Sequence, residues 1–125
     1  MTERTIRILV ADDEAAVRGF LRVLLEGAGY HVIEAADGKH ALRQARAGRV
    51  DLVITDLVMP EQEGIETIQA LRQEVPGIGI IAVSGAFEGQ FLQVAEMMGA
   101  DAVLTKPLSP EALLASVADV LKRKR

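Results

Sequence analysis

Polar residues that could support metal and phosphoryl chemistry follow apolar runs at four places in the chain. They are Asp12 and Asp13, Asp56, Ser84, and Lys106. Crowded carboxylates raise one another's pKa unless a cation joins them, and oxygen ligands without nitrogen or sulfur suit a hard ion such as Mg²⁺. A lysine and a hydroxyl beside such an ion would neutralise and hold a phosphoryl group. In that chemistry Asp56 is the candidate nucleophile, and its product would be an acyl phosphate.

The position of Asp56 depends on the apolar run that begins at Val50 and precedes it. A short run rich in β-branched residues predicts a strand buried on both faces. In open α/β sheets, ligands bind at the carboxyl ends of the strands, where variable loops stand on a rigid scaffold. Asp56 is therefore expected at such an edge.

Runs rich in Val and Ile recur along the whole chain, and segments with helical periodicity separate them. The runs lie at 6–11, 31–35, 50–55, 78–83 and 102–105. This alternation predicts five βα units, and hence a parallel sheet with helices on both faces. Because parallel strands end at one edge, the four polar positions should converge there.

Five helices are expected between and after these runs. In the first, an apolar stripe at 17, 20, 21, 24 and 25 includes Phe20, Arg18 and Arg22 face outward, and Gly27 ends the helix. The others begin after the capping residue Asp37, near Ile65, near 88 and at Ser109-Pro110. The fourth, at about 88–98, should be the least stable because Gly89 lies near its start.

Composition limits the class of protein. The chain has 125 residues, half of them hydrophobic, and it contains no cysteine. This size predicts a single domain over residues 1–125, with a core at about 5–122. No apolar stretch approaches the roughly eighteen residues of a membrane span, and the start lacks the pattern of a secretory signal. We therefore expect no membrane partner and a cytoplasmic location, which the lack of cysteine also fits.

The charge balance bears on partners. The formal net charge is −4 at pH 7, which argues against direct nucleic-acid binding, because such binding depends on basic surfaces. The basic cluster at 122–125 is best interpreted as the end of the last helix, where cations complement the helix dipole.

Each candidate residue alone has an ordinary explanation. Asp12 or Asp13 could cap the next helix, Ser84 could be a turn residue, Lys106 a surface cation and Asp56 a loop acid. Their joint placement after successive strands makes these explanations improbable as a set.

These motifs resemble the receiver domains of two-component response regulators. The resemblance covers about residues 5–122 and is carried by Ala11-Asp12-Asp13-Glu14, Thr55 to Pro60 with Gly64, Val83-Ser84-Gly85, and Gly99 to Pro107. It implies a flavodoxin-like, doubly wound, five-stranded parallel sheet in the order 2-1-3-4-5 with five helices.

The resemblance also implies a site and a donor. A histidine kinase or histidine phosphotransfer protein would transfer a phosphoryl group to Asp56. Mg²⁺ would be held by Asp12 or Asp13, by Asp56 and by the backbone carbonyl of Val58. The protein would then be a signalling phosphoacceptor that catalyses only its own phosphorylation and dephosphorylation.

Ser84 and Lys106 would contact the phosphoryl group, and the Lys106-Pro107 bond is expected to be cis. Gly85, which follows Ser84, leaves the entrance open to donor and water. The signal would leave through the face formed by the fourth helix, the strand at 102–105 and the last helix, toward an unknown effector.

One position departs from the family pattern. Receivers usually carry Tyr or Phe three residues before the lysine, where this chain has Val103. Valine cannot make the large swing of an aromatic ring, so the message is expected to pass instead through displacement of residues 84–87 and the fourth helix. Phe87 is a candidate substitute reporter, although core or loop packing explains it more simply.

Two other functions stay open. A pseudo-receiver would bind partners without phosphorylation, which Val103 permits but Asp56, the acid pair and Lys106 disfavour. A Mg²⁺-dependent phosphohydrolase with an aspartyl nucleophile usually has a second acid two residues later, where this chain has Val58. We expect a monomer or a weak, phosphorylation-dependent dimer, and either a stand-alone protein or the receiver of a longer regulator.

Overall fold

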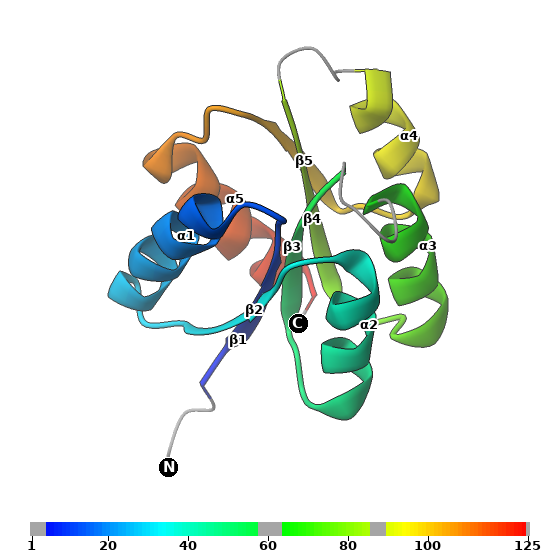
Figure 1. The fold of residues 1–125 in the computed structure, drawn as a ribbon, viewed down its shortest axis with the longest axis horizontal. Helices are drawn as coiled ribbons and strands as arrows, with labels where there is room; N and C mark the ends of the chain where they lie inside the picture. The colour runs from blue at the N-terminus through cyan, green and yellow to red at the C-terminus, as the bar shows by residue number, and fades with distance from the viewer. Residues whose placement is uncertain (1–4, 58–63, 86–89, 125) are drawn as a thin grey trace.

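Five parallel strands form the sheet, in the order β2-β1-β3-β4-β5 (Figure 1). The computed structural model describes residues 5–57, 64–85 and 90–124, with the backbone alone at 90–92. The strands are β1 Arg7–Ala11, β2 His31–Ala35, β3 Leu52–Asp56, β4 Gly79–Ser84 and β5 Ala102–Thr105. This order confirms the predicted flavodoxin-like fold.

Helices cover both faces of the sheet. They are α1 Ala15–Gly27, α2 Gly38–Ala47, α3 Gly64–Glu74, α4 Gln90–Met98 and α5 Pro110–Arg123. Figure 1 shows α1 and α5 on one face and α2, α3 and α4 on the other. Because the central strands are covered twice, alternate residues enter two cores: Leu9 packs with α2 and α3, whereas Ile8 packs with α1 and α5.

Local signals explain where two of the helices begin. The Asp37 carboxylate accepts a hydrogen bond from the His40 backbone N–H at 2.8 Å and caps α2. The Ser109 hydroxyl accepts one from the Ala112 N–H at 3.3 Å and caps α5, whose first residue is Pro110. These two caps confirm the predictions. For α1 the capping explanation was wrong, because the N-cap is Glu14, which makes no side-chain cap bond.

Two predictions about helix faces were also wrong. Phe20 is 44% exposed, because α1 buries only Leu21 and Leu25 fully and leaves Phe20 at the edge of its stripe. Arg18 does not face solvent but lies against β2, paired with Glu34. Both errors have the same cause. Strand order and helix tilt decide which residues at the edge of an apolar stripe contact a neighbouring element, and periodicity specifies neither.

The amino edge of the sheet is held by Arg72 at the end of α3. Its guanidinium donates to the carbonyls of Pro76, Ile78 and Gly99 and to the carboxylate of Asp101, at 2.7 to 3.2 Å. Gly99 has φ +121°, and a Cβ there would meet the Arg72 side chain. Asp101 also accepts a hydrogen bond from the Ile80 N–H. This cluster ties α3, β4 and the α4-β5 connection together at the end opposite the acids.

The basic end of α5 joins the same cluster. Lys124 lies 3.1 Å from the Asp101 carboxylate, and Arg123 pairs with Asp119. The cations at 123 and 124 are therefore engaged within the domain. No helix in the described ranges is long and apolar enough to cross a membrane.

Candidate acidic phosphoacceptor site

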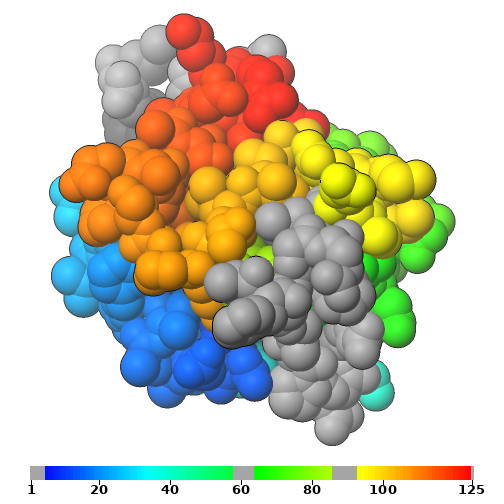
Figure 2. All heavy atoms as spheres, turned by 90° about the horizontal axis from the view of Figure 1, so that it is seen from above, coloured from blue at the N-terminus to red at the C-terminus, as the bar shows by residue number. Residues whose placement is uncertain are grey.

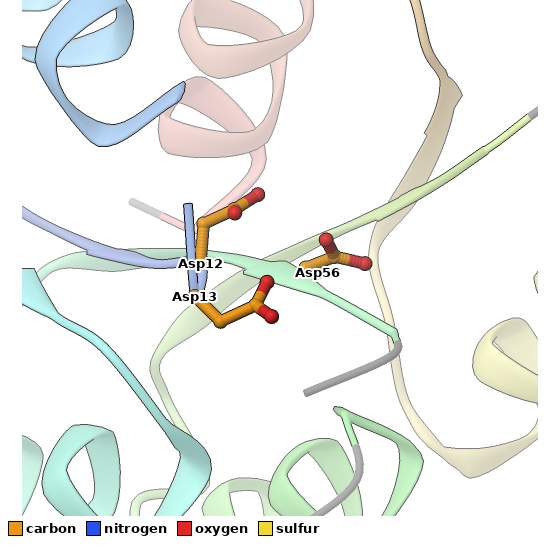
Figure 3. A group of neighbouring side chains, drawn as sticks. All are labelled: Asp12, Asp13 and Asp56. Atoms are coloured by element: carbon orange, nitrogen blue, oxygen red, sulfur yellow. The ribbon is translucent and has the colours of Figure 1, made fainter. Parts of the chain in front are cut away.

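Three carboxylates meet at the carboxyl edge of the sheet. Asp12 and Asp13 follow β1, and Asp56 is the last residue of β3. Each offers an oxygen within 4.8 Å of the others. Figure 3 shows the carboxylates of Asp12 and Asp13 extending to the side on which Asp56 lies. The predicted convergence of these acids is therefore present.

Lys106, which follows β5, joins the acids. Its Nζ lies 2.9 Å from Asp56 Oδ2 and 3.1 Å from Asp12 Oδ2. Its backbone N–H donates to the Ser84 carbonyl at 2.7 Å, which ties β5 to β4 at this edge. The peptide bond to Pro107 is cis, as the resemblance implied. Lys106 is therefore no free surface cation.

Burial and charge shape the titration of this cluster. Burial raises the pKa of Asp12, and the nearby charge of Asp56 adds to this, although the Glu14 N–H and Lys106 act in the opposite direction. Burial lowers the pKa of Lys106, but its bonds and charge interactions with Asp56 and Asp12 outweigh this, so that its pKa is raised. The ammonium of Lys106 pairs with Asp12 and Asp56, and the Asp13 carboxylate, within 4.8 Å of both acids, adds a third negative charge. The site therefore favours a further cation.

Backbone packing holds Asp56 in place. The Asp56 side chain is almost fully buried, and the next residue, Leu57, donates its N–H to the Val83 carbonyl at 3.0 Å. Gly64 at the start of α3 lies against the same backbone: a Cβ there would be 2.5 Å from the Leu57 Cα and against the Asp56 carbonyl oxygen. A residue with a Cβ would therefore not fit at position 64 without a shift of this backbone.

The candidate switch residues lie next to this edge. Ser84 is fully buried at the end of β4, directly opposite Thr105, and its hydroxyl donates to the Gly85 carbonyl at 3.2 Å. Val103, in β5, pairs with Ala82 of β4 and is half-buried. Its side chain packs against the core on the side of the sheet that α2, α3 and α4 cover. The positions agree with the expectation, whereas the switching roles stay predictions.

Some expected contributors lie outside the described residues. Val58, whose carbonyl was expected to hold Mg²⁺, and Phe87, the candidate reporter, are in the segments 58–63 and 86–89. The expected roles of these two residues therefore stay predictions.

Sequence reasoning missed Arg18, which donates from Nη1 to the Asp12 carbonyl at 2.7 Å. The available signal was Glu34 in the run at 31–35, which the strand order places beside the start of α1. An acid there would attract a basic residue on that helix.

The oxygen-only donor set fits a hard divalent cation. The acids of the cluster are carboxylates from two neighbouring strands, and the described residues place no histidine among them. Mg²⁺ and Ca²⁺ take such ligands, whereas zinc and copper sites normally include nitrogen or sulfur. The pocket could therefore hold a magnesium-like ion.

A family model supports the same conclusion. The response regulator receiver domain matches residues 8–118, nearly the whole length. This chain belongs to the family of response regulator receiver domains, which are signalling domains of two-component systems. In these systems, sensor histidine kinases supply the phosphoryl group to the receiver.

Individual relatives place the chain within that family. It is 38% identical to the alkaline phosphatase synthesis transcriptional regulatory protein PhoP of Bacillus subtilis over 118 residues, which cover 94% of this chain and 49% of PhoP. It is 35% identical to the CAI-1 autoinducer sensor kinase/phosphatase CqsS of Vibrio cholerae, over 90% of this chain and 17% of CqsS. The chain thus spans about half the length of PhoP and a smaller part of CqsS.

Solved structures agree with the fold. The chemotaxis response regulator CheY4 of Vibrio cholerae superposes with a TM-score of 0.87 at 32% identity, over 94% of this chain and 99% of that one. A CheY-like receiver domain protein of Methanospirillum hungatei gives 0.92 at 29% identity, over 97% of both chains.

Proposed function

We propose that this domain accepts a phosphoryl group on Asp56 from the phosphohistidine of a sensor histidine kinase or a histidine phosphotransfer protein. The observation that carries the proposal is Lys106 Nζ within 3.1 Å of both Asp56 and Asp12, in a cluster that still has excess negative charge. A purely structural ion pair would not need a third acid beside it.

The transfer requires a nucleophile and a good leaving group. An Asp56 carboxylate oxygen attacks phosphorus, the new O–P bond makes an acyl phosphate, and the P–N bond to the donor imidazole breaks. The electron pair of that bond goes to the imidazole nitrogen. Lys106, which contacts Asp56, and the hydroxyl of Ser84, at the end of the neighbouring strand β4, are the proposed contacts of the phosphoryl oxygens.

Asp12, Asp13 and Asp56, with the carbonyl of Val58, are the proposed holders of Mg²⁺. When bound, the ion would neutralise charge on the phosphoryl oxygens as they approach Asp56. The chain's own contribution is to collect the acids: β1 brings Asp12 and Asp13, and β3 brings Asp56.

The proposed output is the α4-β5-α5 face. Val94 and Met97 are exposed on α4, and Met97 is 80% exposed. Figure 2 shows the carboxyl edge from above, with the start of α1 (blue), the β5-α5 connection (orange) and α4 (yellow) around it. A shift of Ser84 and Gly85 toward a phosphoryl group would reach α4 through the chain that joins them.

The test is incubation with Mg²⁺ and acetyl phosphate, followed by intact mass measurement. The parent should gain one phosphoryl group, and Asp56→Asn or removal of Mg²⁺ should abolish the gain. Asp119→Asn, which changes an exposed acid on α5, is the matched control and should behave as the parent. A parent without an adduct would contradict the proposal and favour the pseudo-receiver, whereas continuous release of phosphate from unrelated phosphoesters would favour a hydrolase.

A further inference from the structure

Arg18 links the first helix to the backbone of the acid pair. Its Nη1 donates to the Asp12 carbonyl at 2.7 Å, and its Nε donates to Glu34 Oε1 at 3.0 Å. The side chain is only 17% exposed. The guanidinium therefore bridges α1, β2 and the turn that carries the acids.

The Asp12 backbone is held from two sides. Its N–H donates to the Ala35 carbonyl at the end of β2, and its carbonyl accepts from Arg18. Its carboxylate is held separately, since Oδ1 accepts the Glu14 N–H and Oδ2 accepts from Lys106. Asp12 would thus keep its side-chain contacts if Arg18 were lost.

Asp13 is in a different position. It is exposed, and in the described part of the chain its carboxylate makes no hydrogen bond or ion pair. No contact of its own restrains the carboxylate, so the backbone that leads into Asp13 matters more for its placement, and the peptide that precedes Asp13 is the one whose carbonyl Arg18 holds. A peptide group is planar, so a hydrogen bond to this oxygen restrains the orientation of the peptide from which Asp13 follows.

The charge of Arg18 is balanced by Glu34 and not by the acid pair. Glu34 accepts from Arg18 and, at 2.6 Å, from Arg22, and Arg22 also pairs with Glu26. Two cations and two anions alternate in this chain of contacts. Arg18 therefore acts on the acid pair mainly through geometry and not through its charge.

We propose that Arg18 is a positioning residue for the cation site: by holding the Asp12 carbonyl and bracing against Glu34, it aims the Asp13 carboxylate at the ion. This inference rests on the proposed function, because it concerns the same Mg²⁺ site. Groups that orient metal ligands typically change metal affinity by about tenfold or more when they are removed.

The test compares Arg18→Ala with Arg22→Ala. Both variants remove one cation from Glu34, but only the first removes the bond to the Asp12 carbonyl. The measurement is the Mg²⁺ dissociation constant of the unphosphorylated domain by calorimetric titration, together with Tm without Mg²⁺. We expect about a tenfold weaker Mg²⁺ affinity for Arg18→Ala, and a change below twofold for Arg22→Ala.

A kinetic measurement separates positioning from general damage. In Arg18→Ala, the Mg²⁺ concentration for half-maximal phosphorylation by acetyl phosphate should rise, while the rate at saturating Mg²⁺ stays within twofold of the parent. If Arg18→Ala does not fold, Arg18→Lys, which keeps the charge but not the two-pronged donor geometry, should show the same shift.

Equal dissociation constants for the Arg18 and Arg22 variants would overturn the inference and leave the proposed function intact. A lower Tm for Arg18→Ala without a change in its Mg²⁺ dissociation constant would likewise overturn the inference and leave the proposed function intact. A parent that binds no Mg²⁺ overturns both, and it is recognised before any variant is made.

Discussion

Lys106 supplies a positive charge in direct contact with two acids of the site. In Lys106→Ala, the acids at 12 and 56 lose a cation within 3.1 Å. Because the lysine side chain is 23% exposed, we expect a loss of about 1–3 kcal/mol in the free energy of unfolding, less than for a fully buried pair. Chemical denaturation without divalent ions measures this loss.

Added Mg²⁺ should restore part of that stability, since the ion supplies the missing positive charge. Lys39→Ala, which changes an exposed lysine at the start of α2, is the control and should show neither effect. A Lys106→Ala protein as stable as the parent without Mg²⁺ would show that the lysine does not compensate the acids.

Glu34 makes stability depend on pH. The Arg22 hydrogen bond lowers the pKa of Glu34, burial opposes this, and Arg18 adds to the lowering. A lowered folded-state pKa gives stabilisation that is present above the unfolded pKa, at about 4.3, and is lost as pH falls through the folded value. Glu34→Gln should therefore be less stable than the parent at pH 7, by about 1 kcal/mol or less.

The difference between Glu34→Gln and the parent should disappear in acid. Denaturation midpoints measured at pH 7 and at a pH below the lowered folded-state pKa of Glu34 test this, with Glu111→Gln at the start of α5 as the comparison. A gap that persists in acid would mean that packing, and not charge, makes Glu34 stabilising.

At the scale of elements, the start of α3 packs closely against the end of β3 and so constrains the backbone of the site. Gly64→Ala would push a Cβ into the backbone at Asp56 and Leu57. Overpacking of this kind typically costs about 1–3 kcal/mol. The expected result is a lower free energy of unfolding together with slower phosphorylation of Asp56, because the strand end that carries the nucleophile must shift.

Gly19→Ala in α1 is the matched control for this prediction. A Cβ at Gly19 would meet nothing within 4 Å, so the alanine should stabilise the helix by about 0.5–1 kcal/mol. A lower free energy of unfolding for Gly64→Ala together with a higher one for Gly19→Ala would support the steric argument. A neutral Gly64→Ala would contradict it.

Element boundaries were largely predictable because their signals are local. The strand at 102–105 and the caps Asp37 and Ser109 lie where the sequence indicated. The exposed sides of α1 and α4 were not predictable in this way. Phe20 fits an apolar stripe and is nevertheless exposed, as is Met97 on α4, because the side of a helix that meets the sheet depends on how neighbouring helices share the space.

For the whole molecule, a cation that binds only the folded state must raise Tm by mass action. The acids at 12, 13 and 56 come from segments far apart in the chain, so an unfolded chain cannot assemble them. At a Mg²⁺ concentration one hundred times the dissociation constant, the gain is about 2.7 kcal/mol, which corresponds to a rise of several degrees in a domain of this size.

Thermal unfolding with increasing Mg²⁺ measures this gain, and Asp13→Asn should reduce it. Na⁺ at equal ionic strength controls for screening. If Tm rose equally with either salt, the stabilisation would be non-specific and the cluster would not be a Mg²⁺ site.

By itself, the sequence determined the alternation of strands and helices, the residues at the strand ends and their chemistry. Those properties are local: periodicity, caps and residue type set them. Only the tertiary structure decided that Lys106 contacts both Asp12 and Asp56, that Arg18 holds the backbone of the acid pair, and that Arg72 ties α3 to the α4-β5 connection. These contacts join residues far apart in the chain, and their existence depends on strand order, register and helix tilt, which no local pattern encodes.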